Sequence, residues 1–390
     1  KDSFWTWREM MYSAAARLEP EDVYDASRMA FLEMLLTGIT AVGEFHYLHR
    51  DVKGKAYDDP NLLAKEVIRA ARDVGVRIAL LRVAYARSGF QVEANPRQQR
   101  FIEAAPEEFL SHVEKLRSDL SRDAAPDEAW VGVAPHSVRA APLDYLREVV
   151  RYSVEQQLRV HMHVAEQPAE NAACLAEHGR TPVSLLTDEN ILSERFTGVH
   201  AVHITDAEAQ AMARARAFVC ACPTTERNLG DGIVPADLFL RHGVRVALGT
   251  DSHTQIDLLE DARELEYHLR LEKQERNVLA PESDDESSAL AARLFESATI
   301  HGASSIGANG GALETGRPAD FFTVALDDAS IAGASPDDLL SSIVFSLART
   351  AMREVFVGGK RLVEDGRHRS QEGIVEKFSA LQGRLWNLKD

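Results

Sequence analysis

The sequence is short of cysteines and has no long apolar run, and each shortage excludes a class of protein. Three cysteines in 390 residues are too few for a disulfide-stabilised secreted fold. Cys220 and Cys222 lie two positions apart on an expected strand, so their side chains share a face and do not easily bridge, and Cys174 stands alone. No run of about 18 apolar residues occurs, so we expect no membrane span. This pattern is typical of a protein of the reducing cytoplasm.

Positive charge is also scarce. The 44 Lys and Arg residues are outnumbered by 61 Asp and Glu residues, and the formal net charge is −17 at pH 7. Such a field repels nucleic acid and anionic membranes, so neither is expected as a partner. The first residues, KDSFWTWREMMY, lack the apolar region and cleavage site of a signal peptide. The expected partner is therefore a small molecule, which can be anionic if arginines lie in its site, and a homodimer is left open.

Apolar runs of strand length alternate with helical patterns over the first two thirds of the chain. The runs are continuously apolar, which indicates strands buried on both faces, and strands separated by helices predict parallel βαβ units. Seven strands are expected, at 40–46, 77–84, 129–136, 159–165, 197–204, 217–223 and 244–251. A closed (β/α)8 barrel needs eight, so the pattern predicts either an open sheet or a barrel that lacks one strand.

The pattern changes towards the C-terminus. GGALETGRPADFFTVAL (310–326) and REVFVGGKRLVEDGRH (353–368) are typical of short strands joined by glycine turns. We therefore expect an α/β barrel over residues 1–305, part of a small β-domain over 306–370, and a C-terminal helix or tail over 371–390.

Histidines and carboxylates gather where the expected strands end, which is where the catalytic groups of parallel barrels lie. The stretch VHMHVAEQ (160–167) places His161 and His163 on alternate positions and Glu166 three residues later. The strand-end residues are His46, Tyr47, His136, His163, Glu166, His200, His203, Asp251, Ser252 and His253. Any one of these histidines could be an ordinary buried imidazole. A chance collection of core histidines would not lie at the same end of five of the seven expected strands.

The chemistry that this set supports is metal-assisted hydrolysis. Neutral imidazole and carboxylate suit zinc or iron, and a catalytic site leaves one coordination position for water. A bound metal lowers the pKa of that water to roughly 7. A carboxylate three residues beyond a histidine ligand, as Glu166 is beyond His163, can then move protons between the water and a leaving nitrogen. We expect one divalent metal ion, with zinc preferred and iron as the alternative.

Three motifs at these strand ends resemble the amidohydrolase superfamily, in its deaminase branch. They are HVAE (163–166), VHAVH (199–203) and TDSH (250–253). The stretch ATIHGASSIGANGGALETGRPADFFTV (298–324) resembles the return of those chains into their β-sandwich. The resemblance implies a TIM-type barrel of the metal-dependent hydrolases, here lacking its first strand, together with the C-terminal part of the small β-sandwich domain.

Three further stretches resemble the formimidoylglutamate deiminases of bacterial histidine degradation. They are DSFWTWREMMY (2–12), EFHYLHRD (44–51) and APHSVRA (134–140), of which DSFWTWRE is the most specific. The resemblance implies hydrolysis of N-formimino-L-glutamate to N-formyl-L-glutamate and ammonia.

The resemblance also implies roles for single residues. His163 and Asp251 would bind the metal, and Asp251 would take a proton from the attacking water. Glu166 would protonate the departing nitrogen, and His200 would hold the attacking oxygen. The substrate would be held by Arg8, Tyr47, His136 and Arg139. We expect Arg8, in the aromatic segment FWTWR, to close over the site from the first loop. Two arginines agree with a diacid substrate because each guanidinium can grip one carboxylate with two parallel hydrogen bonds, although either could instead form an ordinary surface pair.

One part of the superfamily pattern is missing from the sequence. The first barrel strand of those enzymes ends in H-x-H, which supplies two further metal ligands, and the only H-x-H here is HMH at 161–163. We expect the motif upstream of Lys1, in residues omitted from this chain, and a true truncation is the alternative. The count of seven strands leads independently to the same gap. His161, His203 and His253 could each either pack in the core or form a hydrogen bond to a metal-binding residue, and the sequence leaves both roles open.

Two other functions are weighed against this one. Another aminohydrolase of the same branch, acting on guanine, adenosine or S-adenosylhomocysteine, would need an apolar or aromatic surface for the ring. A metal-free scaffold would keep the fold without the chemistry. The presence of both Glu166 and Asp251 argues against a scaffold.

Overall fold

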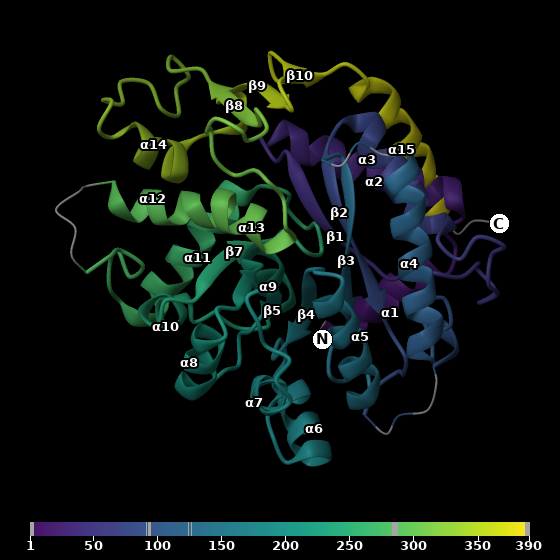
Figure 1. Cartoon of the computed structure of the whole chain (residues 1–390). Coiled ribbons are helices and arrows are strands. Elements are labelled where there is room, and N and C mark those ends of the chain that lie inside the picture. The colour runs from purple at the N-terminus through teal and green to yellow at the C-terminus, as the bar shows by residue number, and fades with distance from the viewer. Residues whose placement is uncertain are drawn as a thin grey trace.

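The computed structural model describes residues 4–90, 92, 95–123, 125, 127–282 and 288–386. A seven-stranded parallel sheet with surrounding helices forms most of the molecule, and a small antiparallel sheet lies beside it (Figure 1). Residues 387–390 of the predicted C-terminal tail lie outside the described residues.

The strands of the large sheet follow one another in chain order. They are β1 (Ala41–His46), β2 (Arg77–Ala84), β3 (Ala129–Pro135), β4 (Val160–Val164), β5 (Phe196–His200), β6 (Phe218–Ala221) and β7 (Arg245–Leu248). Every neighbouring pair is parallel. All eight residues of β2 are buried, as expected for a strand covered on both faces. The predicted α/β fold of the TIM type, with seven strands, is confirmed.

The sheet curls so that its two edge strands approach the same segment. Helix α13 (Gly302–Ile306) contacts both β1 and β7. Ile306 fills the space over Gly43, because a Cβ placed on that glycine would lie 2.6 Å from Ile306 Cγ2. The preceding π-helical turn, Ser297–His301, is fixed to β7 by His301, whose Nδ1–H donates to the carbonyl of Val246 at 3.0 Å. A side chain at position 43 would therefore clash with Ile306.

Three strands end earlier than the apolar runs predict. The apolar run at 197–204 continues past His200, but β5 ends there because His200 and Ala201 take left-handed backbone angles, with φ of 69° and 50°. β6 ends at Ala221 because a helix begins at Pro223, and β7 ends at Leu248, before Asp251 with φ of 42°. The prediction that a strand ends near His203 is therefore wrong.

Helices connect the strands. The predicted helix at 20–36 is confirmed as α2 (Pro20–Leu36). The others are α1 (Phe4–Ala15), α3 (Leu62–Val74), α4 (Pro106–Asp123), α5 (Leu143–Glu155), α6 (Pro168–His178), α7 (Pro182–Asp188), α8 (Asp206–Arg214), α9 (Pro223–Leu229), α10 (Ala236–Arg241), α11 (Leu258–Lys273) and α12 (Ala289–Glu296). None of the helices in the described part of the chain combines the length and the apolar character that a membrane crossing requires.

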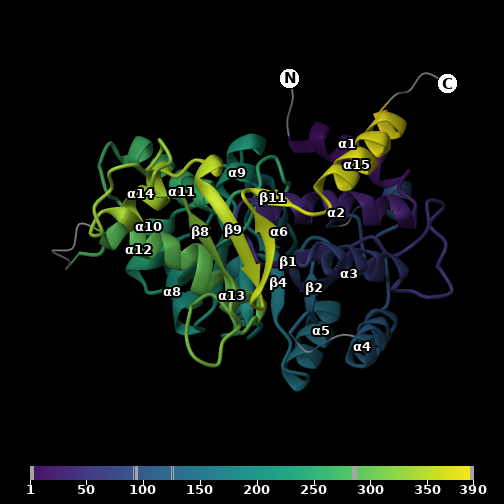
Figure 2. The same cartoon turned by 90° about the horizontal axis from the view of Figure 1, so that it is seen from above.

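The small sheet comes from the C-terminal part of the chain. It contains β8 (Phe321–Val324), β9 (Met352–Val357), β10 (Lys360–Glu364) and β11 (Arg367–His368), in the order β11-β10-β9-β8 and antiparallel throughout. Gly358 and Gly359 join β9 to β10 with φ of 57° and 77°, the backbone that a two-residue hairpin turn requires. Helix α14 (Leu339–Ser346) precedes β9, and α15 (Gln371–Trp386) packs along α2 (Figure 2). The division of the chain at residue 305 stays a prediction.

A buried ion pair ties β2 to the segment before α4. Arg82 is fully buried and donates to both carboxylate oxygens of Glu103, at 2.5 and 2.8 Å. Its Nε donates to Asn61 Oδ1 at 2.9 Å, and His112 Nδ1 lies 2.6 Å from Glu103 Oε1. Burial alone would raise the pKa of Glu103, but His49, Arg82 and His112 hold it well below its usual range.

We predict that Glu103→Gln lowers the free energy of unfolding by about 3–5 kcal/mol, because Arg82 would keep its buried charge without a charged partner. The measurement is urea denaturation followed by tryptophan fluorescence. The matched control is Glu21→Gln, whose partner Arg69 lies 2.8 Å away on the surface and which should cost less than about 1 kcal/mol. Equal losses in the two variants would contradict the role given to the buried pair.

Candidate active site

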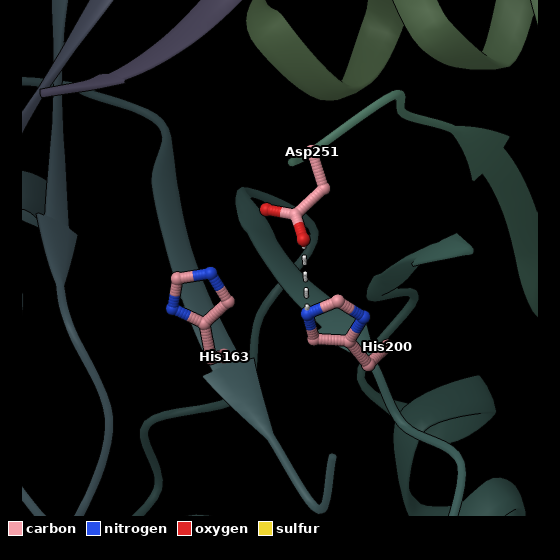
Figure 3. Close-up of side chains that lie close together, drawn as sticks. All are labelled: His163, His200 and Asp251. Carbon is pink, nitrogen blue, oxygen red and sulfur yellow. Dashed lines mark ion pairs between the residues drawn. The ribbon is translucent and has the colours of Figure 1, made fainter. Parts of the chain in front are cut away.

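Three strand ends bring His163, His200 and Asp251 together (Figure 3). His163 lies near the end of β4, His200 is the last residue of β5, and Asp251 follows β7. One ligand atom from each lies within 4.8 Å of the others. His200 Nε2 is 4.0 Å from Asp251 Oδ2. The group faces a cavity of about 1010 Å³.

The imidazole of His163 is held so that one nitrogen is free for a ligand. Its Nδ1 lies 3.1 Å from the carbonyl oxygen of His136, which can only accept, so Nδ1 carries the hydrogen. Burial and the neighbouring His200 lower the pKa of His163 to about 4, so the ring is neutral. The ring stacks on His200 with centroids 5.5 Å apart and contacts Phe45 at 4.3 Å. His163 thus presents an unprotonated Nε2 to the cavity, as a metal-binding histidine does.

His200 lies among three carboxylates. Its side chain is 1% exposed, and its Nδ1 is 3.1 Å from Glu226 Oε1. Its Nε2 faces Glu166 Oε1 at 3.8 Å as well as Asp251. Burial alone would lower the pKa of His200, but Glu166, Glu226 and Asp251 together raise it well above its usual value. The left-handed backbone angle of this residue is the kind of strain that collects at functional sites.

Glu166 follows β4 and reaches the same group. Its side chain is 13% exposed, and burial raises its pKa. The backbone N–H of Glu166 donates to Glu170 Oε2 at 3.1 Å, and burial raises the pKa of Glu170 to about 7. Burial therefore favours the protonated form of Glu166, which is the form that a general acid needs.

The residues predicted to hold the substrate line the same cavity. They are Arg8, Tyr47, His136 and Arg139. The Tyr47 and His136 rings meet edge to face, with centroids 6.0 Å apart. Arg139 forms no ion pair with a carboxylate of the described residues, and its buried Nε has no hydrogen-bond partner there. Its guanidinium is therefore free to bind an anionic group that enters the cavity.

Arg8 reaches the cavity in a different way from the predicted one. The expectation that it closes over the site from a loop is wrong, because residues 4–15 form helix α1. The Arg8 guanidinium carbon lies 5.6 Å from the ring centroid of Tyr12 on the next turn of that helix. The aromatic segment carries no clear helical pattern of apolar residues, so its sequence did not indicate this helix.

The remaining histidines differ in their surroundings. His161 Nε2 is 2.9 Å from the carbonyl of Ser305, so this side chain ties β4 to α13 and serves packing. His203 Nε2 is 2.8 Å from the carbonyl of Asp231. His253 lines the cavity beyond Asp251. Of the two histidines in HMH, His163 is the one that joins the cluster.

Sequence reasoning missed Glu226. This residue lies on α9, a seven-residue helix that no prediction included. Pro223 at the first position of the helix was the available signal, since proline favours that place. The signal does not indicate that a carboxylate one turn later points at His200.

The donor set fits a divalent metal ion. The imidazole nitrogen of His163 and the carboxylate of Asp251 suit zinc and other first-row metals, and the His163 ring is oriented through its second nitrogen. His163 and Asp251 would hold the ion, with His200 beside it. No H-x-H other than HMH occurs in the sequence.

Comparison with known proteins decides the family. A family model described as the amidohydrolase family matches residues 1–362. The chain belongs to the amidohydrolase family. It is 38% identical over 385 residues to a formimidoylglutamate deiminase of Pseudomonas aeruginosa, covering 98% of this chain and 83% of that protein. It is 26% identical over 376 residues to a 5-methylthioadenosine/S-adenosylhomocysteine deaminase of Natronomonas pharaonis, covering 96% and 78%.

Solved structures of amidohydrolase-like proteins match as well. An amidohydrolase from Brucella melitensis superposes with a TM-score of 0.90 and 37% identity, covering 98% of this chain and 83% of that one. An adenosine deaminase from Xanthomonas campestris with bound zinc has a TM-score of 0.82 and 21% identity, covering 99% and 80%, and this likeness concerns the fold alone.

Loss of a residue that is hydrogen-bonded to a metal ligand typically lowers metal affinity by about 10- to 100-fold. We predict that His163→Ala, which removes a ligand itself, lowers metal affinity by more than this. The measurement is metal content by mass spectrometry after dialysis against limiting zinc, with circular dichroism to verify folding. His161→Ala is the matched control, since it removes the same side chain two residues away on β4 and should retain the metal. Equal metal content in the two variants would contradict the cluster.

Proposed function

We propose that this amidohydrolase hydrolyses N-formimino-L-glutamate to N-formyl-L-glutamate and ammonia, a step of histidine degradation. The observation that carries the proposal is that all eight residues assigned from sequence line one cavity: Arg8, Tyr47, His136, Arg139, His163, Glu166, His200 and Asp251. The similarity to the Pseudomonas deiminase over nearly the whole chain supports the same reaction.

The side chains in the cavity suit a small diacid. Arg139 faces the cavity without an ion-pair partner among the described carboxylates, and Arg8 lines the same space. Each can grip one carboxylate with two parallel hydrogen bonds. Tyr47 and His136 line the same cavity, and in this proposal they would contact the formimino group. Local arginines thus offset the repulsion that the acidic protein exerts on an anion.

The proton steps can be assigned to side chains of this chain. A divalent metal held by His163 and Asp251 would supply an activated water at neutral pH. Asp251 would take the proton that this water releases as its oxygen adds to the carbon of the cationic formimino group. His200 Nε2, 3.8 and 4.0 Å from Glu166 and Asp251, donates to the new oxygen. Glu166 would then protonate the terminal nitrogen, the carbon–nitrogen bond would break and ammonia would leave. The hydroxyl proton released as the formyl carbonyl forms would pass back to Glu166, and the proton held by Asp251 would leave with ammonia as ammonium.

Three finer assignments accompany this proposal. Zinc is the preferred metal because imidazole and carboxylate ligands suit it, and iron is the alternative. A cytoplasmic location follows from the cysteine usage. A homodimer stays a prediction, which light scattering would decide.

The experiment that tests the function compares substrates. Ammonia release by the metal-loaded full-length protein is measured with N-formimino-L-glutamate, guanine, adenosine and S-adenosylhomocysteine, and the formyl product is identified by NMR. We expect kcat/KM to be highest for N-formimino-L-glutamate. Preference for a ring substrate would overturn the proposal in favour of the ring-acting relatives at 26% identity.

We predict that Arg139→Met and Arg8→Met each lower kcat/KM for N-formimino-L-glutamate by about ten- to a hundredfold or more, because a hydrogen bond to a charged group is worth about 1.5–3 kcal/mol. Each is also assayed on N-formimino-glycine, which lacks the side-chain carboxylate. The variant that lacks the arginine binding that carboxylate should lose much less kcat/KM on the smaller substrate than on the full one.

A surface arginine provides the control for these variants. Arg147 lies on α5, paired with Glu189 at 2.6 Å, and Arg147→Met should leave kcat/KM unchanged. If both cavity variants lose the same factor on both substrates, the arginines are structural and do not select a diacid.

A further inference from the structure

One buried carboxylate of the site has no assigned role. Glu226 lies on α9, behind the imidazole of His200, and is 2% exposed. Its Oε1 accepts hydrogen bonds from His200 Nδ1 at 3.1 Å and from the backbone N–H of Cys222 at 2.9 Å. Among the described residues, His200 is the one cationic group within ion-pair distance of Glu226. The carboxylate is therefore directed at a single ring.

Burying such a group is costly without compensation. A carboxylate in an apolar interior is destabilising unless it is hydrogen-bonded or paired, and here burial raises the pKa of Glu226. A neutral or apolar side chain would fill the same position at lower cost. By contrast, the buried Glu208 caps α8 through Thr205 and also accepts from Ser184, so its bonds connect backbone segments. The bonds of Glu226 converge on one imidazole and the turn beside it.

The hydrogen bond determines which way the ring of His200 faces. A carboxylate can only accept, so Nδ1 carries the hydrogen that it receives. The opposite nitrogen, Nε2, is then directed between Glu166 at 3.8 Å and Asp251 at 4.0 Å. Flipping the ring would place a carbon against Glu226 and turn Nε2 away from the cavity.

We propose that Glu226 is a positioning residue, which keeps a proton on Nδ1 of His200 and holds Nε2 at the point where the substrate oxygen develops charge. This inference rests on the proposed deiminase function. The logic is that of a carboxylate that orients a catalytic histidine through its other nitrogen. Glu226 itself is not among the residues that line the cavity.

Kinetics of two variants test the role. Glu226→Ala removes the acceptor, whereas Glu226→Gln keeps an oxygen acceptor and loses the charge. We expect Glu226→Ala to lower kcat per bound metal by about 10- to 100-fold, the size typical of partners that orient site histidines, with KM within about twofold. Glu226→Gln should retain more of kcat than Glu226→Ala.

The control is Glu208→Ala, which removes a buried carboxylate from the neighbouring region without touching the site. It should lower thermal stability and leave kcat of the folded protein unchanged. If Glu226→Ala behaves in the same way, or if kcat per bound metal is unchanged, Glu226 is structural and the inference is overturned.

A spectroscopic measurement tests the orientation without relying on activity. Long-range ¹H–¹⁵N correlation spectra of zinc-loaded protein with ¹⁵N-labelled histidine report which ring nitrogens carry hydrogen, and a His200→Gln variant assigns the signals. His200 Nδ1 should be protonated in the wild type and in Glu226→Gln, and should shift toward the unprotonated position in Glu226→Ala. An unchanged signal in all three proteins would overturn the inference. If the wild type fails to hydrolyse N-formimino-L-glutamate, the proposed function fails, while these spectra still decide the role of Glu226.

Discussion

Parallel strands end on the same side of a sheet, and the whole site depends on that constraint. Each of β4, β5 and β7 carries a polar side chain at or just beyond its C-terminal end, and the curl of the sheet turns those side chains towards one another. His163 and Asp251 are 88 positions apart in the chain, yet the two can share an ion because their strands run the same way. Left-handed backbone angles at His200 and Asp251 end the extended conformation where these side chains are needed.

The carboxylates at this rim repel one another unless a cation lies among them. Glu166, Glu226 and Asp251 raise the pKa of His200 against the lowering effect of burial, and burial together with the same carboxylates raises the pKa of Asp231 to about 8. Such crowding of buried acids is destabilising unless a positive charge compensates. An imidazolium at His200 supplies one such charge, and a divalent ion between His163 and Asp251 would supply more. The arrangement thus favours cation binding at the same position that the proposed chemistry requires.

The sequence allowed most of the sheet and the main site residues to be predicted. Continuous apolar runs identify buried strands, and polar residues at their ends identify the rim, so His163, His200 and Asp251 were expected together. Helices α1 and α9 were not expected, because neither shows a clear helical spacing of apolar residues and α9 has only seven residues. Glu226 was missed for the same reason: its role depends on a contact across 26 positions that no local pattern encodes.

The most direct test of the central claim is the position of the metal. Anomalous diffraction from a zinc-loaded crystal of the full-length protein, recorded at the zinc absorption edge, locates the ion without assumptions about activity. The account predicts a peak within coordination distance of His163 Nε2 and the Asp251 carboxylate, roughly 2.0–2.2 Å from each. A peak at another acidic group, such as Glu103, Glu108 and His112, with none at His163 and Asp251, would contradict the account.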